Sequence, residues 1–306
     1  MNWIKVFAPA TVANVGPGFD ILGMAIESWG DTVEARRSDS GVSISEIVSD
    51  YPIPKSPEAN TASIATIEVL RELGNPGGVE LRIKKGLPPG SGLGSSAASA
   101  AAGAFACNYL YGNKLTSQQL IDAATNAEES VSGRYADNTS AAILGSAVLV
   151  KSVSPVEIIR LGSINELKLI VVTPQIKVLT KEARATLPEK IALKDTVKAM
   201  ANTSAVATAF LKDDYNLFVN SLEDVISEPI RKKLIPGYDR IKKAAIYSGA
   251  DGFIISGSGP TLCAFSNKPK EKCESILKAM ESEIENTGLS YQSMVTGIDR
   301  KGTRLI

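Results

Sequence analysis

The chain has 306 residues, of which 44% are hydrophobic and 22% are charged, and this composition excludes a disordered, collagen-like or disulfide-scaffold protein. Its 33 Lys and Arg residues balance 33 Asp and Glu residues, so no overall field attracts nucleic acid or an anionic membrane. The absence of histidine excludes the Ser-His-Asp triad, the Cys-His dyad and His-ligated zinc. Any chemistry must use carboxylates, Lys, Arg, hydroxyls, amides, the backbone or a metal held by oxygen.

Up to residue 173, strands are predicted over residues 4–8, 31–36, 79–84, 147–151 and 169–173. The third alternates apolar and polar side chains, and the last is a short apolar run closed by Pro174. A helix is predicted over 95–111, ending at Gly112. A second helix starts after Thr116, which forms a capping-box pattern with Gln119, and runs to about residue 131.

In the second half, helices are predicted over 195–211, 216–226, 238–248 and 269–286, and strands over 253–255, 262–265 and 292–298. Hairpins mix with crossovers in this order, so the predicted class is α+β in two layers. We expect the boundary between two domains inside 153–165, which gives an N-terminal domain of residues 1–155 and a C-terminal domain of residues 156–306.

The cysteines and the N-terminal segment favour a cytoplasmic location. Cys107, Cys263 and Cys273 are odd in number and lack CxxC spacing, as expected of reduced thiols. The opening MNWIKVFAPA has no apolar core of a signal peptide. Residues 86–113 carry no charge, but they contain Gly, Pro, Ser and Asn throughout and are mostly Ala where apolar. They therefore lack the strongly apolar residues that a membrane span needs. We therefore expect a small-molecule substrate, with neither nucleic acid nor membrane as a partner.

The stretch 84–98, KKGLPPGSGLGSSAA, is the most informative. Gly90, Gly92 and Gly94 allow positive φ and close approach of a ligand to the backbone. Ser95 and Ser96 are expected to cap the following helix and to aim hydroxyls at an anion. The helix N-terminus adds unpaired N–H groups and a partial positive charge, so this stretch predicts a phosphate site.

Two other phosphate loops are excluded here. No Lys follows Gly94, as a Walker loop requires, and position 95 is Ser rather than the last Gly of a dinucleotide fingerprint. A glycine-rich turn before an Ala-rich core helix stays open as the structural alternative. Lys85, beside the loop, is expected to be a solvated charge.

The run from Pro88 to Ala98 resembles the PxxxGLGSSAA phosphate loop of the GHMP kinases, the superfamily of galactokinase, homoserine kinase, mevalonate kinase and phosphomevalonate kinase. Residues 256–261, SGSGPT, are similar to the SGxGPT loop of its C-terminal half. The resemblance implies a two-domain fold, with an N-terminal ribosomal-protein-S5-like domain and a C-terminal ferredoxin-like domain. It also implies that ATP contacts Asn60, Pro89, Gly90, Ser91, Gly92, Leu93, Gly94, Ser95, Ser96, Gly257, Ser258 and Gly259.

The segment 8–23, APATVANVGPGFDILG, is similar to the opening of homoserine kinases within this superfamily. From the residues alone, Gly16-Pro17-Gly18 is a turn between an amide, Asn14, and a carboxylate, Asp20. A carboxylate suits the ammonium of an amino acid, and an amide suits a hydroxyl or carboxylate. A surface turn stabilised by these side chains is the alternative.

Two further segments each present an arginine. Residues 180–188 resemble the family's T-x-x-A-R-x-x-L-P, and residues 228–237 its E-P-x-R-x-x-x-[IL]-P-G. Two arginine forks could bind one α-carboxylate in bidentate fashion. The resemblance implies that homoserine contacts Asn14, Asp20, Tyr135, Asn138, Thr180, Arg184, Arg231 and Gly259.

The resemblance also implies a Mg²⁺ site at Ser96 and Glu128, whose hydroxyl and carboxylate are hard oxygen ligands. Glu128 is preferred to its neighbour Glu129 because of its spacing to Ser132-Gly133. One departure stands out, because Tyr135 occupies the place of a substrate-contacting His in the family's H-x-D-N. Its phenol can donate one hydrogen bond, and it does not become cationic near neutrality.

The expected activity is ATP-dependent phosphorylation of the side-chain hydroxyl of L-homoserine. Phosphoryl transfer depends mostly on positioning and charge neutralisation. The resemblance to homoserine kinases implies no obvious base, with Asn138 near the reacting hydroxyl and Arg184 in the catalytic set. Asp137 is the reserve candidate for a base, because mevalonate-type relatives use an Asp in that neighbourhood. Two alternatives stay open: a kinase for threonine, shikimate or mevalonate, and a silent nucleotide-binding regulator. A homodimer also stays open.

Overall fold

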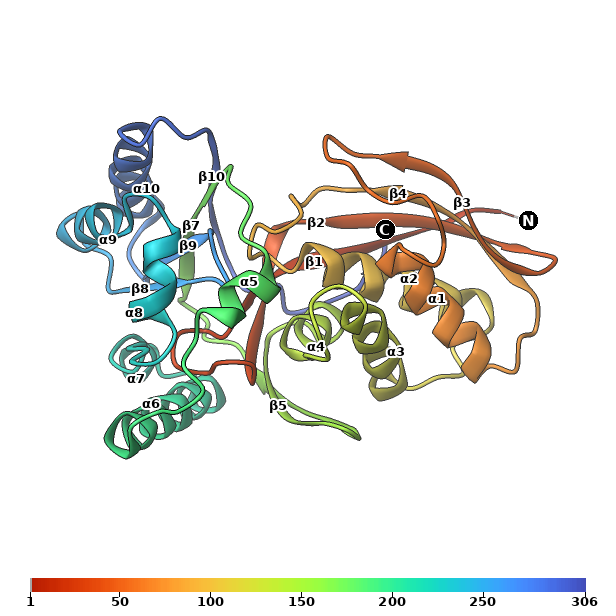
Figure 1. Cartoon of the computed structure of the whole chain (residues 1–306), viewed down its shortest axis with the longest axis horizontal. Coiled ribbons are helices and arrows are strands. Elements are labelled where there is room, and N and C mark those ends of the chain that lie inside the picture. The colour runs from red at the N-terminus through yellow and green to blue at the C-terminus, as the bar shows by residue number, and fades with distance from the viewer. Residues whose placement is uncertain (1) are drawn as a thin grey trace.

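The computed structural model describes residues 2–306 as an α+β fold with two sheets (Figure 1). The strands are β1 (Ile4–Ala13), β2 (Leu22–Ser38), β3 (Gly41–Val48), β4 (Gly78–Lys84), β5 (Ala147–Val153), β6 (Val156–Gly162), β7 (Lys168–Pro174), β8 (Gly252–Ile255), β9 (Leu262–Ser266), β10 (Tyr291–Thr296) and β11 (Arg304–Leu305). The helices are α1 (Thr61–Glu72), α2 (Ser95–Leu110), α3 (Ser117–Glu129), α4 (Asp137–Leu144), α5 (Thr180–Ala185), α6 (Leu193–Lys212), α7 (Tyr215–Val219), α8 (Glu228–Arg231), α9 (Tyr238–Tyr247) and α10 (Lys270–Glu285).

The first sheet has seven strands, with β11, β1, β2, β4 and β3 in that order and with the β5–β6 hairpin attached to β2. Helices α1 to α4 cover one face of it (Figure 1). The central helix α2 is built almost entirely of small residues because other elements approach it closely. A Cβ on its Gly103 would lie 2.2 Å from the carbonyl oxygen of Ala62 in α1. The charge-free stretch therefore forms a buried helix, as the sequence predicts.

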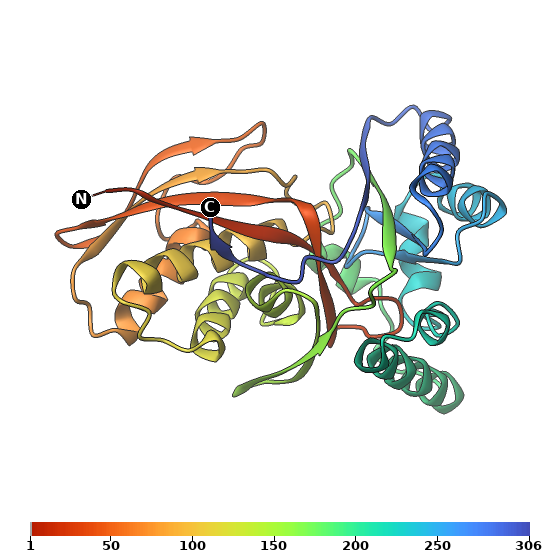
Figure 2. The ribbon, with the colours of Figure 1, turned by 180° about the vertical axis from the view of Figure 1, so that it is seen from behind.

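The second sheet contains β10, β7, β9 and β8, all antiparallel. It is buried on both faces, which explains the uninterrupted apolar run in β7. Ile170 and Val172 face a cluster with α9 and α10, whereas Leu169 and Val171 face a core that continues into the first half of the chain. Figure 2 shows the two sheets from behind, with α6 and α7 beside the second. Within residues 2–306, no helix is long and apolar enough to cross a membrane.

Most predicted elements are confirmed, and the helix predicted at 216–226 is wrong beyond Val219. The Thr116 capping box is present, because its hydroxyl accepts from the Gln119 N–H and the Gln119 side chain accepts from the Thr116 N–H. Beyond α7, the Asp224 carboxylate accepts the N–H groups of Ile226, Ser227 and Glu228 and holds a turn where the helix was predicted to end. The sequence patterns did not predict β3, α1, α4, β6 or α5.

The change from the first sheet to the second falls between Gly162 and Lys168. The β5–β6 hairpin spans the boundary predicted at residues 155 and 156, and β11 returns to the first sheet beside β1. A division of the chain at that boundary stays a prediction.

A buried ion pair lies beneath the glycine loop. The Lys85 ammonium donates to the carboxylate of Asp31 on β2, to the Ser95 carbonyl at 2.8 Å and to the Ser99 hydroxyl at 2.9 Å. Asp31 also accepts the N–H groups of Gly86 and Leu87. The Lys85 side chain is only 4% exposed, so the prediction of a solvated charge is wrong. The pair connects β2, the start of the loop and the first turn of α2.

We expect Lys85→Met to lower the free energy of unfolding by about 3–5 kcal/mol, because it leaves the buried Asp31 carboxylate without its cation. Urea unfolding measures the change. Lys84→Met is the matched control, since Lys84 is exposed, and it should alter stability by less than about 0.5 kcal/mol. Equal unfolding midpoints for the two variants would contradict a structural role for the pair.

Candidate active site

A cavity of about 400 Å³ opens between the two halves of the chain, within the usual size range of small-molecule sites. The predicted site residues that line it are Asn14, Asp20, Asn60, Pro89, Gly90, Ser91, Gly92, Gly94, Ser95, Ser96, Glu128, Tyr135, Asp137, Asn138, Thr180, Arg184, Arg231, Gly257 and Ser258. Leu93 is fully buried in the core behind the loop, and Gly259 supports the loop from outside the cavity wall.

The glycine loop presents backbone to this cavity. Gly90, Gly92 and Gly94 all have positive φ, and Gly94 is the N-cap residue of α2 without a side-chain cap. The Ser95 hydroxyl donates to the Leu87 carbonyl at 2.9 Å, so the expectation that it caps the helix is wrong. The first N–H groups of α2 therefore lack a side-chain cap at the cavity wall, as an anion site requires.

The second glycine loop docks on the first. The hydroxyl of Ser256 donates to the Gly92 carbonyl at 2.6 Å, and that of Thr261 donates to the Ser91 carbonyl at 2.7 Å. A Cβ on Gly92 would lie 2.5 Å from the Ser256 carbonyl oxygen and 2.8 Å from that of Gly259. Glycine at this position thus allows two backbones to touch, and both loops form one wall.

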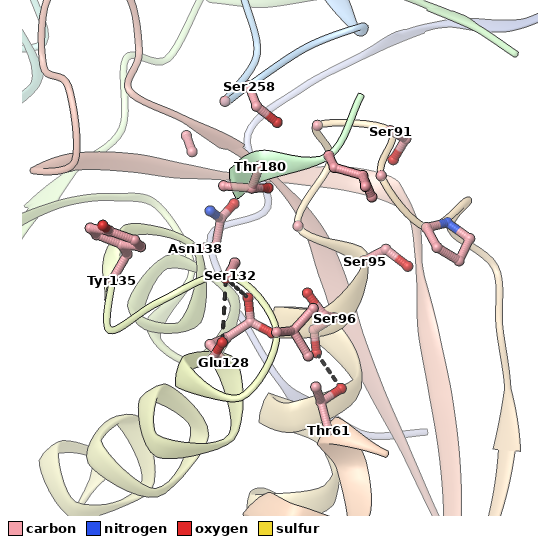
Figure 3. Close-up of a pocket in the computed structure, with 18 of the residues that line it drawn as sticks. Thr61, Ser91, Ser95, Ser96, Glu128, Ser132, Tyr135, Asn138, Thr180 and Ser258 are labelled. Atoms are coloured by element: carbon pink, nitrogen blue, oxygen red, sulfur yellow. Dashed lines mark hydrogen bonds between the residues drawn. The ribbon is translucent and has the colours of Figure 1, made fainter. Parts of the chain in front are cut away.

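Glu128 is the strongest candidate for a cation ligand. It is 6% exposed, its Oε1 atom has no hydrogen-bond partner, and burial raises the pKa of its carboxyl. Figure 3 shows Ser96 and Ser132 beside it, and the Ser132 hydroxyl donates to its Oε2 atom at 3.3 Å. An orphaned buried carboxylate oxygen next to a hydroxyl fits a hard divalent cation. Since no group of three acidic or Cys side chains gathers anywhere in residues 2–306, other ligands would have to come from the nucleotide or water.

Asp137 and Asn138 lie at the start of α4. Burial, together with the nearby charge of Asp20, raises the pKa of Asp137 to about 7. The Asn138 amide oxygen accepts from the Thr11 hydroxyl at 2.6 Å, and its NH₂ group lies 3.3 Å from Asp137 Oδ1. Because its oxygen faces Thr11 on β1, the amide of Asn138 turns its NH₂ group toward Asp137.

Arg184 and Arg231 lie close enough on the cavity wall for their charges to interact. Arg184 forms an ion pair of 2.6 Å with Asp20, and Arg231 donates to the Gly257 carbonyl at 2.8 Å. The Nε atoms of both side chains are buried without a partner. Burial lowers the pKa of Arg231, and the charge of Arg184 adds to that effect. Two partly unsatisfied guanidinium groups beside each other favour an anionic ligand.

The two predicted side-chain amides are already engaged. Asn14 donates to the Gly257 carbonyl at 3.0 Å and accepts from the Asp20 N–H. Asn60 is the N-cap of α1 and also donates to the Pro54 carbonyl at 2.9 Å. Direct contact of either amide with a ligand stays a prediction.

The sequence patterns missed several residues of the cavity wall. They include an apolar strip that precedes Asn60, together with the first residue of α1 and two lysines, one before α5 and one inside it: Pro52, Ile53, Pro54, Ala59, Thr61, Lys177 and Lys181. The paired prolines were the available signal for the first group. Lys181 stands inside the T-x-x-A-R segment, next to the arginine that drew attention to it.

Comparison with known proteins identifies the family. The family model described as GHMP kinases N terminal domain matches residues 60–146, and that of GHMP kinases C terminal matches residues 206–286. A homoserine kinase of Pyrococcus abyssi is 39% identical over 298 residues, 97% of each chain. One of Arabidopsis thaliana is 42% identical over 313 residues, 99% of this chain and 84% of the relative.

Solved structures agree with this result. The crystal structure of homoserine kinase from Cytophaga hutchinsonii has a TM-score of 0.95 and 40% identity, and the match covers 100% of this chain and 98% of that one. A mevalonate kinase structure at 17% identity, with a TM-score of 0.71, shares the fold. The chain belongs to the GHMP kinases and, within them, to the family of the homoserine kinases.

Proposed function

We propose that the protein transfers the γ-phosphoryl group of ATP to the side-chain hydroxyl of L-homoserine, which yields O-phospho-L-homoserine and ADP. The paired guanidiniums of Arg184 and Arg231 carry this proposal, because they share one cavity with a phosphate loop. A cavity with an anion site at each end suits a nucleotide and a small carboxylate.

ATP binds with its phosphates along the wall formed by the two glycine loops, where glycine backbone and the start of α2 supply N–H donors. Lys177 and Lys181 add positive charge near the loop, and Asn60 lies on the apolar side of the cavity with Pro52 and Pro54. Ser96 and Glu128 would hold Mg²⁺, which when bound would supply charge neutralisation for phosphoryl transfer.

Homoserine binds at the other end. Its carboxylate pairs with Arg184 and Arg231, and its ammonium faces Asp20, which already holds Arg184 in place. Thr180, on α5, and Tyr135 complete this side of the cavity (Figure 3). The side-chain hydroxyl of homoserine then points to Asn138. The Thr11 hydroxyl holds the amide oxygen of Asn138, which leaves the NH₂ group on the side of the substrate.

In the transfer, the homoserine oxygen forms a bond to the γ phosphorus while the bond from that phosphorus to the β,γ-bridging oxygen breaks and ADP leaves. Asp137 accepts the hydroxyl proton. Its raised pKa near 7 makes a carboxylate basic enough for that step at neutral pH. Positioning by Asn138 and the arginines supplies the rest.

A coupled assay of ADP release tests the function directly. The chain should release ADP with ATP, Mg²⁺ and L-homoserine, and at least about 100-fold more slowly with threonine, shikimate or mevalonate at the same concentration. Faster turnover of another alcohol would assign the chain to a different substrate. ATP binding without ADP release from any alcohol would favour a regulator.

We expect Arg184→Met and Arg231→Met each to raise the homoserine KM by at least about 30-fold, because each removes a charge-assisted bond to the carboxylate. The KM for ATP should change by less than about threefold. Arg240→Met, in an exposed side chain of α9, is the control. An unchanged homoserine KM in either variant would refute its assignment.

We expect kcat/KM of the wild-type chain to rise with pH through about 7 and to level off above it, because Asp137 must lose its proton before it can accept another. Asp137→Asn should lower kcat at pH 8 by about 100-fold or more and remove that rise. A near-normal kcat in Asp137→Asn would contradict a role of Asp137 as the base, and positioning alone would then account for the reaction.

We expect Glu128→Gln to raise the Mg²⁺ concentration for half-maximal activity by about 10-fold or more, since the amide keeps the shape but lacks the charge. Fluorescence titration with Mn²⁺, in the presence of ADP, reads the same affinity without turnover. Glu129→Gln is the matched control, because the Glu129 side chain is 58% exposed. Equal effects of the two changes would remove Glu128 from the cation site.

A further inference from the structure

The guanidiniums of Arg184 and Arg231 lie on aromatic rings. Arg184 lies 4.0 Å from the ring centre of Tyr135 and 5.0 Å from that of Phe19, and Arg231 lies 4.9 Å from the ring centre of Phe19. All three distances are within the range of cation–π contacts. One ring therefore contacts both arginines, and Arg184 contacts a second ring.

These contacts address a problem that the two like charges create. Arg231 is buried, and the positive charge of Arg184 disfavours the positive charge of Arg231. The Nε atoms of both arginines lack a hydrogen-bond partner. Hydrogen bonds therefore do not fully determine where the two planar groups lie. The negative face of an aromatic ring attracts a guanidinium and leaves its N–H edge free for a ligand.

The chain next to each ring is constrained. Gly133 has φ +112°, and a Cβ there would lie 2.6 Å from Tyr135 Cε2, so only glycine leaves room for the ring. Phe19 precedes Asp20, whose N–H donates to the side chain of Asn14. Asn14 in turn donates to the Gly257 carbonyl, which also accepts from Arg231. Phe19 and Arg231 are thus linked through the Asn14 side chain and the Gly257 carbonyl as well as through the ring.

We propose that Phe19 and Tyr135 are positioning residues that hold Arg184 and Arg231 for the substrate carboxylate, and that Tyr135 acts through the face of its ring rather than through its phenol hydroxyl. This inference rests on the proposed function. It gives the tyrosine that replaces the family's histidine a different task, since the ring supports an arginine and does not bind the substrate.

The test uses Tyr135→Leu, Phe19→Leu and the conservative Tyr135→Phe, with Tyr247→Leu as the control because Tyr247 is 93% exposed on α9. Each variant is assayed for homoserine KM and kcat, and thermal melting checks that it is folded. Tyr135→Leu and Phe19→Leu should raise the homoserine KM by about 5- to 30-fold, with kcat within about threefold. Tyr135→Phe should stay within about threefold of the wild-type KM.

Two inhibitors separate loss of positioning from general damage. L-2-aminobutyrate keeps the carboxylate and lacks the hydroxyl, whereas 3-aminopropan-1-ol keeps the hydroxyl and lacks the carboxylate. In both Leu variants the inhibition constant of the first should rise in parallel with KM, and that of the second should change by less than about twofold.

Three results would overturn the inference while the wild-type chain phosphorylates homoserine. They are a loss in Tyr135→Phe as large as in Tyr135→Leu, unchanged KM in both folded Leu variants, and equal weakening of the two inhibitors. A wild-type chain that does not phosphorylate homoserine would overturn the proposed function, and the inference with it. Wild-type turnover is therefore measured first.

Discussion

The buried pair of Asp31 and Lys85 is the interaction on which the site depends most. A carboxylate and an ammonium removed from water are tolerated only when their remaining hydrogen-bonding capacity is used. Here the backbone N–H groups of Gly86 and Leu87, the Ser95 carbonyl and the Ser99 hydroxyl use it. Because these partners belong to both ends of the glycine loop, satisfying the ion pair also fixes the loop. The first N–H groups of α2 then hold their direction before any ligand arrives.

The cavity separates its charges by function. At one end, the proposed phosphate site consists of glycine backbone and the helix N-terminus, and the orphaned Glu128 oxygen lies beside it as the proposed cation ligand. At the other end, two full positive charges and the Asp20 carboxylate match the charges of an amino acid. Asp137 lines the same cavity, where burial and the charge of Asp20 raise its pKa to about 7. The absence of histidine is compatible with this arrangement, because neither anion binding, cation binding nor proton transfer in the proposed reaction needs an imidazole.

Much of the fold could be predicted from sequence, but less of the site's detail. Local sequence patterns predicted the glycine loop around Gly94, the helix cap at Thr116 and the arginine at position 231. Lys85 was assigned to solvent because a lone charge beside a loop carries no sign of its partner, which lies 54 positions earlier on another strand. Phe19 carried no sign either, since an aromatic residue in a turn looks the same whether it faces solvent or two guanidiniums. The turn at residues 224–228, where a helix was predicted to end, is held by the Asp224 side chain, which accepts backbone N–H groups. In each case the prediction failed because the contacting residue is distant in sequence or because a side chain takes the backbone hydrogen bonds of a regular helix.

The contact between the two glycine loops has a mechanical consequence. Separating them would break the bonds from Ser256 and Thr261 to the phosphate loop and expose tightly packed backbone. On the opposite side, the Val178 N–H before α5 donates to the Gly90 carbonyl at 3.4 Å, and the Lys177 side chain lies next to Gly90. Arg184 connects α5 to Asp20 and to the rings of Phe19 and Tyr135. The two glycine loops therefore keep a fixed position relative to each other, so a ligand that lies against one loop is also placed relative to the other.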